Sequence, residues 1–311
     1  MPAPQRNSSP YPLPSALAAQ SRFVKLGRSN VPALLAHPDP QWKRPCPTVI
    51  WMHGRTVSKE LDNGRYLRWI RAGIAACAID LPGHGERYEI DRQHPAETLG
   101  VLAQAIGEID GVVEALADPV FGGAFDLDRL GIGGMSAGGM VTLRRLCDDH
   151  PFMCAAVEST AGNLGLLYGG VRAGLVATAP AAHAPDRLEP LDPIRHLDQW
   201  RPIPFQAIHA RHDEWVNVDG QREFIEALRE TSRGGGGDPS LVEFHVFDER
   251  TGAPHEHAGF GRFGAQAKDI QLDFWRRTLG AGQAGPGVGP GVGPGTGPGL
   301  GPSAAAGAAG A

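Results

Sequence analysis

Apolar positions along the chain follow two different spacings, and the two kinds of segment alternate. Short apolar runs typical of buried strands occupy residues 21–26, 31–37, 48–53, 74–80, 129–135, 154–160, 205–210 and 241–247. Apolar residues three and four positions apart predict helices over 59–73, 96–118, 137–150, 219–230 and 265–279. This alternation predicts an α/β protein with a mostly parallel, eight-stranded sheet and helices on both of its faces.

One domain accounts for most of the chain, because both ends differ from it in composition. Residues 1–21 are rich in Pro, Ser and Ala and are expected to be flexible, so the domain is assigned to residues 22–280. Residues 281–311 carry a four-residue Pro-Gly repeat with few apolar side chains, which predicts a disordered tail. A stretch rich in Gly, Ala and Pro, at about 163–199, interrupts the alternation and is expected to form a short lid.

Charge and composition narrow the class of partner. A net charge of −5 at pH 7 and a pI near 6.2 argue against a nucleic-acid-binding or anionic-membrane surface, so a small-molecule or short peptide substrate is expected. The N-terminus lacks a signal-like apolar segment, and no run approaches the roughly 18 apolar residues of a membrane helix. These features predict a cytoplasmic protein. The four cysteines form no C-x-x-C pair and are expected to be free thiols, not disulfides or metal ligands.

A glycine-rich segment at 131–140, GIGGMSAGGM, contains the pattern G-x-S-x-G around Ser136. It follows an apolar strand and precedes a helical pattern, so Ser136 is expected to lie where a strand turns sharply into a helix. Gly134 and Gly138 allow close backbone packing around such a turn, which would leave the serine hydroxyl exposed. The positive end of the following helix would favour a developing anion at this point. Ser136 is therefore the candidate nucleophile.

A serine hydroxyl is a poor nucleophile near neutral pH, so the hypothesis requires a base and a group that orients the base. Asp213 follows the strand at 205–210 and is the candidate acid, because active-site groups collect at the carboxyl ends of parallel strands. An aspartate that only caps the following turn is the simpler alternative. Glu158, at the end of the strand before, is the second candidate for the acid.

Two histidines, His255 and His257, lie in the loop after the last strand, and either could be the base. His257 is preferred, because Ala258 and Gly259 leave space beside it, whereas Pro254 stiffens the backbone next to His255. The choice between the two histidines stays open at the level of sequence.

The segment WMHGRT, residues 51–56, follows a buried strand and is the candidate for the remaining part of the site. After His53 and Gly54 the chain can turn so that the backbone N–H of Arg55 points to the same place as the N–H of Ala137. These two donors would form an oxyanion hole. His53 itself is expected to be structural. Cys77 is expected to be a core residue, and a direct catalytic role is not assigned to His84.

These motifs together resemble the α/β-hydrolase superfamily, over residues 22–279. HGRT resembles the oxyanion turn, GGMSAGG the nucleophile elbow, and HARHDEWV the segment that carries the acid. The order of Ser136, Asp213 and His257 is that of the superfamily, and the later segments look most like the dienelactone-hydrolase and prolyl-oligopeptidase-like branch. Ala210 and Asn217 depart from the usual acid segment, and the histidine loop is less regular than usual.

The resemblance implies an α/β-hydrolase fold and a serine hydrolase that cleaves a carboxylic ester without a metal or organic cofactor. Ser136 would attack the carbonyl carbon, His257 would accept its proton, and Asp213 would orient the imidazole. Two alternatives remain: a serine peptidase of the prolyl-oligopeptidase-like type, and a catalytically silent module of the same fold that only binds a partner.

Overall fold

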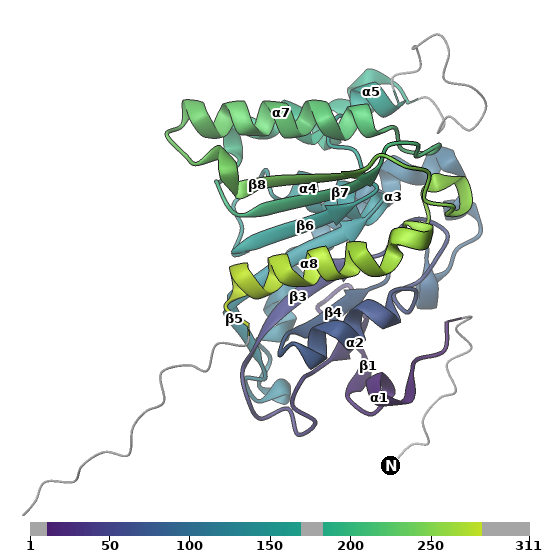
Figure 1. The fold of residues 1–311 in the computed structure, drawn as a ribbon. Helices are drawn as coiled ribbons and strands as arrows, with labels where there is room; N and C mark the ends of the chain where they lie inside the picture. Colours follow the sequence, from purple (N-terminus) through teal and green to yellow (C-terminus); the bar gives the residue numbers. More distant parts are fainter. Residues whose placement is uncertain (1–10, 169–182, 282–311) are drawn as a thin grey trace, which may run out of the picture.

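Eight strands form a single sheet at the centre of the computed structural model, which describes residues 11–168 and 183–281 (Figure 1). Their order across the sheet is β1-β2-β4-β3-β5-β6-β7-β8. In this sheet β2 runs antiparallel to the other seven strands, which are parallel to one another. The strands are β1 (Ser21–Leu26), β2 (Val31–Ala36), β3 (Cys46–Met52), β4 (Ala75–Ile79), β5 (Phe125–Met135), β6 (Cys154–Glu158), β7 (Phe205–Ala210) and β8 (Val242–Phe247). The predicted strands and the mostly parallel sheet are confirmed.

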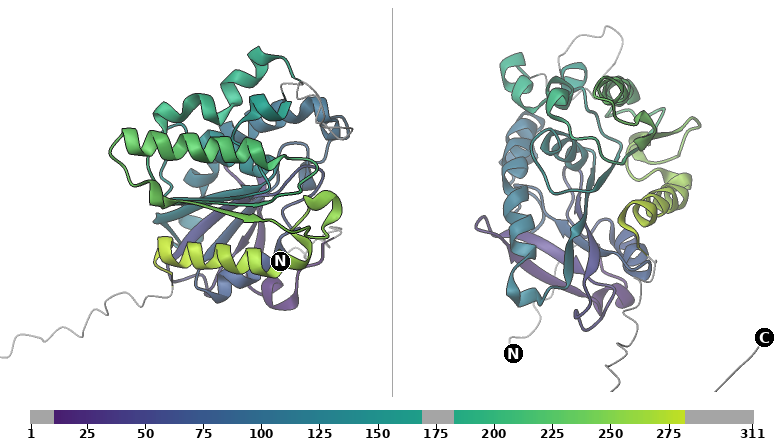
Figure 2. Two further views of the ribbon diagram at one scale, coloured as in Figure 1. Left: turned by 45° about the horizontal axis from the view of Figure 1, so that its top comes forward. Right: turned by 90° about the vertical axis from the view of Figure 1, so that its left-hand side faces the viewer.

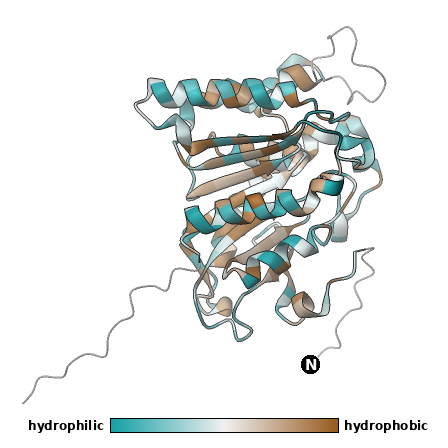
Figure 3. Ribbon diagram, viewed as in Figure 1, coloured by the Kyte–Doolittle hydropathy of each residue, from teal (hydrophilic) through white to brown (hydrophobic). Residues whose placement is uncertain are grey.

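Both faces of the sheet are buried, which explains the nearly continuous apolar runs in the central strands. Every residue of β3 is buried, and its side chains alternate between two hydrophobic clusters. Ile50 and Met52 lie in the cluster on one face, and Val49 and Trp51 lie in the cluster on the other. The brown strands of Figure 3 therefore lie between helices whose outer faces are polar.

The helices cover the sheet in two layers, as predicted. The longer ones are α2 (Asn63–Arg71), α3 (Thr98–Leu116), α4 (Ala137–Arg145), α7 (Val218–Gly234) and α8 (Gly264–Leu279). Side chains of α2 and α8 enter one cluster, and side chains of α3, α4 and α7 enter the other. Figure 2 shows α3 and α8 on opposite faces of the sheet. Short 3-10 helices complete the connections: Gly85–Arg87, Asp91–Gln93, Pro95–Glu97, Pro119–Phe121, Glu189–Leu191, Pro193–Gln199, Pro239–Leu241, Pro254–Glu256 and Gly261–Phe263.

The segment before the sheet corrects the expectation that residues 1–21 are flexible throughout. Residues 15–18 form a short helix, α1 (Ser15–Ala18), and Leu17 is fully buried in the same cluster as Tyr66 and Trp69 of α2. Burial of one leucine side chain contributes about 1.5–3 kcal/mol to holding this segment against the domain. Residues 1–10 lie outside the described residues.

The region expected to form a lid follows β6 and contains α5 (Leu164–Tyr168) and α6 (Pro185–Leu188). Leu164, Tyr168 and Leu188 are buried in the larger cluster, so the described ends of this region belong to the core. Residues 169–182, and the tail from 282 onward, lie outside the described residues. Within the described ranges, no helix has the length and apolar character needed to cross a membrane.

Candidate active site

Ser136 lies between the end of β5 and the start of α4, in the strand-to-helix turn that the sequence predicts. Its φ of +53° and ψ of −117° are strained for a residue with a side chain. The neighbouring glycines are required by close packing. A Cβ added at Gly134 would lie 2.4 Å from the backbone of Gly138, and one added at Gly138 would lie 2.3 Å from the carbonyl oxygen of Met52. The turn therefore fits only with small residues at both positions.

The strained turn is held by hydrogen bonds from the next strand. The Ser136 N–H donates to the carbonyl oxygen of Glu158 at 2.9 Å, and the Thr160 hydroxyl donates to the Ser136 carbonyl oxygen at 2.8 Å. Both partners lie at or just beyond the carboxyl end of β6. A backbone conformation of this kind persists when its surroundings determine it from several sides.

His257 and Asp213 are in direct contact, although 44 residues separate them in sequence. His257 Nδ1 lies 2.8 Å from Asp213 Oδ2, and the two residues are 3 % and 8 % exposed. The other oxygen, Asp213 Oδ1, accepts the backbone N–H groups of Trp215 and Val216 at 2.9 and 2.8 Å. The carboxylate is thus fixed by the turn after β7. The imidazole is held through Nδ1, and its Nε2 has no hydrogen-bond partner among the residues that the structure describes.

His255 has a different environment. Its ring is half exposed and stacks on Trp215, with ring centroids 4.7 Å apart, and its Nδ1 lies 3.5 Å from Glu214 Oε2. No contact between His255 and Asp213 occurs among residues 11–168 and 183–281. Of the two candidate bases, only His257 has the contact with Asp213 that the hypothesis requires.

A pocket of about 280 Å³ brings the remaining candidates together. Ser136, His257, Arg55 and Ala137 all line it, while Asp213 lies behind His257. The turn after β3 is close to the serine, since a Cβ added at Gly54 would lie 3.8 Å from Ser136 Oγ. No hydrogen bond joins His257 to Ser136 within the described part of the chain, but catalytic hydrogen bonds are often long before substrate binds.

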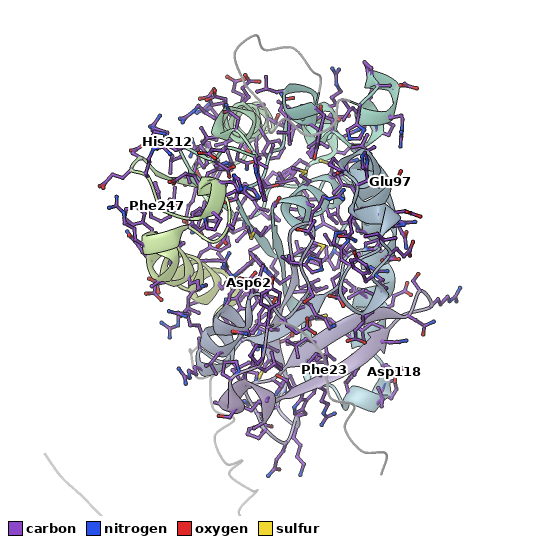
Figure 4. The ribbon with its side chains drawn as sticks, turned by 90° about the vertical axis from the view of Figure 1, so that its right-hand side faces the viewer. Phe23, Asp62, Glu97, Asp118, His212 and Phe247 are labelled. Atoms are coloured by element: carbon purple, nitrogen blue, oxygen red, sulfur yellow. The ribbon has the colours of Figure 1, made fainter. Side chains whose placement is uncertain are left out.

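The pocket opens at the edge of the sheet where the parallel strands end. Figure 4 views the molecule from this side, with Glu97 and His212 on opposite sides of the edge. Glu97 precedes Thr98, which lines the pocket, and His212 precedes Asp213. Groups from several strand ends can therefore act on one substrate here, as is usual for open parallel sheets.

Two other histidines, close to the turn after β3, are held by structural contacts. His53 Nε2 accepts the Leu81 N–H at 3.0 Å, and its Nδ1 lies 2.5 Å from the Gly54 carbonyl oxygen. His84 Nδ1 lies 2.8 Å from the Pro82 carbonyl oxygen, and burial lowers its pKa to about 4. Neither ring is among the residues that line the described pocket.

Glu158, the second candidate acid, is committed to another partner. Arg65 on α2 donates to both of its carboxylate oxygens, at 2.8 and 2.7 Å, and Gln271 on α8 donates to it at 3.0 Å. This network is buried on the face of the sheet covered by α2 and α8. Asp213 is the acid that reaches His257.

Among the residues around the pocket that the sequence analysis did not identify are three with polar side chains close to the candidate site. Thr98 at the start of α3 and Tyr168 at the end of α5 line it, and His209 lies fully buried with its Nε2 3.5 Å from Asp213 Oδ2. The only signal for Tyr168 was its place in the expected lid region. The described residues contain no group of three or more His, Cys, Asp or Glu side chains that could hold a metal ion.

Comparisons of the sequence with known proteins identify a family and a relative. The family described as "Prolyl oligopeptidase family" matches residues 105–282, more than half of the chain. Esterase YjfP of Escherichia coli (strain K12) is 27 % identical over 213 residues, covering 66 % of this chain and 84 % of that protein.

Two solved structures share the fold. Pyrococcus horikoshii acylaminoacyl peptidase has a TM-score of 0.63 at 17 % identity, over 85 % of this chain and 42 % of that chain. A putative dienelactone hydrolase from Klebsiella pneumoniae has a TM-score of 0.57 at 17 % identity, over 83 % of this chain and 98 % of that chain. This chain therefore spans about two fifths of the peptidase but nearly all of the second protein.

Proposed function

Because the chain belongs to the prolyl oligopeptidase family, and so is an enzyme of hydrolase type, we propose that it cleaves a carboxylic ester through an acyl-enzyme on Ser136. The observation that carries this proposal is the buried contact between His257 and Asp213, at 2.8 Å, beside a pocket that Ser136 and His257 both line. A serine with a base and an oriented third group is the arrangement that nucleophilic catalysis needs.

In the proposed reaction, Ser136 Oγ attacks the carbonyl carbon while His257 Nε2 accepts the hydroxyl proton. Asp213 Oδ2 holds Nδ1 of the same ring, which keeps the tautomer correct and stabilises the imidazolium. The oxyanion forms beside the backbone N–H groups of Arg55 and Ala137. Ala137 is the first residue of α4, so its N–H has no acceptor within the helix. His257 then donates the proton to the departing alcohol, which leaves the acyl group on Ser136. In the second half of the reaction water attacks the acyl carbonyl while His257 accepts its proton, and His257 returns that proton to Ser136 Oγ as the acid leaves.

Small esters are the favoured substrate for two reasons. The pocket volume of about 280 Å³ lies just below the roughly 300–1,000 Å³ range of ligand sites. The Escherichia coli relative is named an esterase and matches over most of its length. Hydrolysis of short peptides is the second candidate, supported by the family and by the fold shared with acylaminoacyl peptidase.

The test is hydrolysis of 4-nitrophenyl esters with acyl chains of two to eight carbons. Wild type is compared with Ser136→Ala and with Ser232→Ala, a matched control that removes a buried hydroxyl bonded to the Leu228 carbonyl oxygen in α7. We expect Ser136→Ala to lose at least about 10³-fold in kcat, while Ser232→Ala keeps its activity. Circular dichroism checks the folding of all three proteins.

Labelling with a fluorophosphonate adds a readout that does not depend on substrate choice. Wild type should gain one phosphonyl group at Ser136, and Ser136→Ala should gain none. If Ser136 is labelled but no ester is hydrolysed, hydrolysis of short peptides becomes the favoured function. If wild type neither turns over esters nor takes up the label, the chain is a catalytically silent module of this fold.

A further inference from the structure

The Arg55 side chain is fixed at the wall of the pocket by neutral partners. Nη1 donates to the Thr98 hydroxyl at 2.5 Å, and Nη2 donates to the carbonyl oxygens of Arg92 and His94 at 2.8 and 3.1 Å. Thr98 and Arg55 both line the pocket, as does Tyr168, which lies close enough to interact with the Arg55 charge. The guanidinium is thus held in one place on the wall.

The positive charge of Arg55 has no carboxylate partner within 4 Å among the described residues. Burial lowers the pKa of Arg55, and its electrostatic interactions with Tyr168 and Glu97 offset this only in part. Two other buried cations each have a carboxylate partner. Lys59 lies 2.8 Å from Asp80, and Arg65 lies 2.7 Å from Glu158. A partly buried charge without a counter-ion is costly, so its presence at a pocket wall requires an explanation.

The unused N–H donors of the Arg55 guanidinium also indicate that a partner is missing. A guanidinium has five N–H donors, and the three bonds to Thr98, Arg92 and His94 use three of them. Two donors are left without an acceptor in the described part of the chain. They are the Nε–H and one Nη1–H, and each can donate to an oxygen of an anion.

The rest of the wall is largely apolar, with Val57, Leu61, Met140, Leu167 and Val216 among the lining residues. Such a surface accepts the hydrocarbon part of a small substrate but cannot neutralise a charge. The pocket therefore combines an apolar body with one fixed, uncompensated cation.

We propose that Arg55 selects esters that carry a free carboxylate, which pairs with its guanidinium while Ser136 attacks the ester carbonyl. This inference rests on the proposed ester hydrolysis at Ser136. The carboxylate can belong to the acyl group, as in a half-ester of a dicarboxylic acid, or to the leaving alcohol. Both sources present the same anion to Arg55, and the experiment distinguishes them.

A purely structural role for Arg55 makes a different prediction. If its bonds to Thr98, Arg92 and His94 only hold the loop before α3, its loss disturbs every substrate to a similar extent. If it binds the substrate carboxylate, its loss affects charged substrates selectively. The ratio of kcat/KM for a charged ester to that for its neutral methyl ester separates the two roles, because damage to the loop cancels in that ratio.

The experiment measures this ratio in two arms. The acyl arm compares 4-nitrophenyl hemiglutarate with its methyl ester, and the leaving-group arm compares 4-acetoxybenzoate with methyl 4-acetoxybenzoate. The proteins are wild type, Arg55→Met, Arg55→Lys and, as a control for the loss of one positive charge, Arg28→Met in the turn between β1 and β2. Arg55→Lys keeps the charge but has three N–H donors on a flexible stem in place of five on a fixed plane.

We expect wild type to prefer the charged ester at least tenfold in one arm. Arg55→Met should reduce that ratio by tenfold or more, Arg55→Lys should keep an intermediate ratio, and Arg28→Met should leave it unchanged. A Ser136-dependent hydrolysis whose ratio stays within twofold in all four proteins would overturn the role of Arg55 and leave the proposed function standing. If no ester is hydrolysed in a Ser136-dependent way, both proposals are wrong.

Discussion

Arg65 and Glu158 form an ion pair under the turn that carries Ser136, and its removal provides a test of how that turn is supported. The two residues are 3 % and 1 % exposed and are joined by two hydrogen bonds of 2.8 and 2.7 Å. Gln271 donates to the same carboxylate, and the backbone oxygen of Glu158 accepts the Ser136 N–H. The side chain of Glu158 thus anchors the strand end that holds Ser136, the proposed nucleophile.

We expect Arg65→Met to reduce the free energy of unfolding by about 3–5 kcal/mol, because it leaves a buried carboxylate with only the Gln271 amide as a partner. Glu158→Leu should cost a similar amount, since the guanidinium then retains the neutral Gln271 side-chain oxygen and only one carboxylate, that of Asp62, 3.5 Å from its Nε. The double variant Arg65→Met/Glu158→Leu removes both charges. It should recover most of either loss, because an apolar pair of similar volume can replace a buried ion pair at little cost.

Urea unfolding followed by tryptophan fluorescence measures these differences. Trp51, Trp69 and Trp275 are buried in the cluster next to the pair and report on its integrity. With a urea slope of up to about 3 kcal/mol per molar, a loss of 3–5 kcal/mol lowers the midpoint by about 1 M or more. The reasoning is refuted if both single variants lose less than about 1 kcal/mol, or if the double variant is no more stable than the weaker single variant.

Three further predictions follow from other parts of the structure. Asp213→Asn should fold normally but lose about 10³–10⁴-fold in kcat for an ester, because its amide no longer fixes the tautomer of His257. Gly138→Ala should destabilise the protein by about 1–3 kcal/mol in a urea titration, since its Cβ would meet the Met52 carbonyl oxygen at 2.3 Å. Gly107→Ala in α3, where a Cβ meets nothing within 4 Å, should instead stabilise it by up to about 1 kcal/mol. Burial raises the pKa of Asp80, but His53 and Lys59 outweigh it, and the net pKa lies well below its usual range. The resulting stability is present above pH ~4 and lost as the pH falls further, so urea midpoints of Asp80→Asn should change less below pH ~4 than those of wild type.

The strands and long helices could be predicted because the local pattern and the final environment agree. Both faces of the central strands are covered, so the apolar runs are long, and the amphipathic helices repeat every three to four residues. The helix α1 was missed for a physical reason. It has four residues, too few to show a period, and it is held by the contact of Leu17 with residues more than forty positions away. Such a contact leaves no mark in the sequence around Leu17.

The candidate site divides in the same way. The strand-to-helix turn at Ser136 could be predicted from its neighbours, because the glycines that the turn requires lie two positions before and after it. The histidine was less certain, because His255 and His257 share one loop and differ mainly in which of them meets Asp213 from another strand. The pairing of Glu158 with Arg65, 93 positions away, could not be read from either segment. Residues whose environment is made by other elements need the folded chain.

The Asp213 carboxylate can cap a turn and orient His257 at the same time, so these two interpretations do not exclude each other. The sequence offered a choice between a carboxylate that caps the turn after β7 and one that orients the base. The two tasks fall on different oxygen atoms: Oδ1 accepts the Trp215 and Val216 N–H groups, and Oδ2 lies 2.8 Å from His257 Nδ1. The cap fixes the position of the carboxylate, and this fixed position is what an orienting group requires. An aspartate that caps the turn just after a parallel strand is therefore compatible with a place in the active site. A nearby loop that carries a histidine makes such a place more plausible.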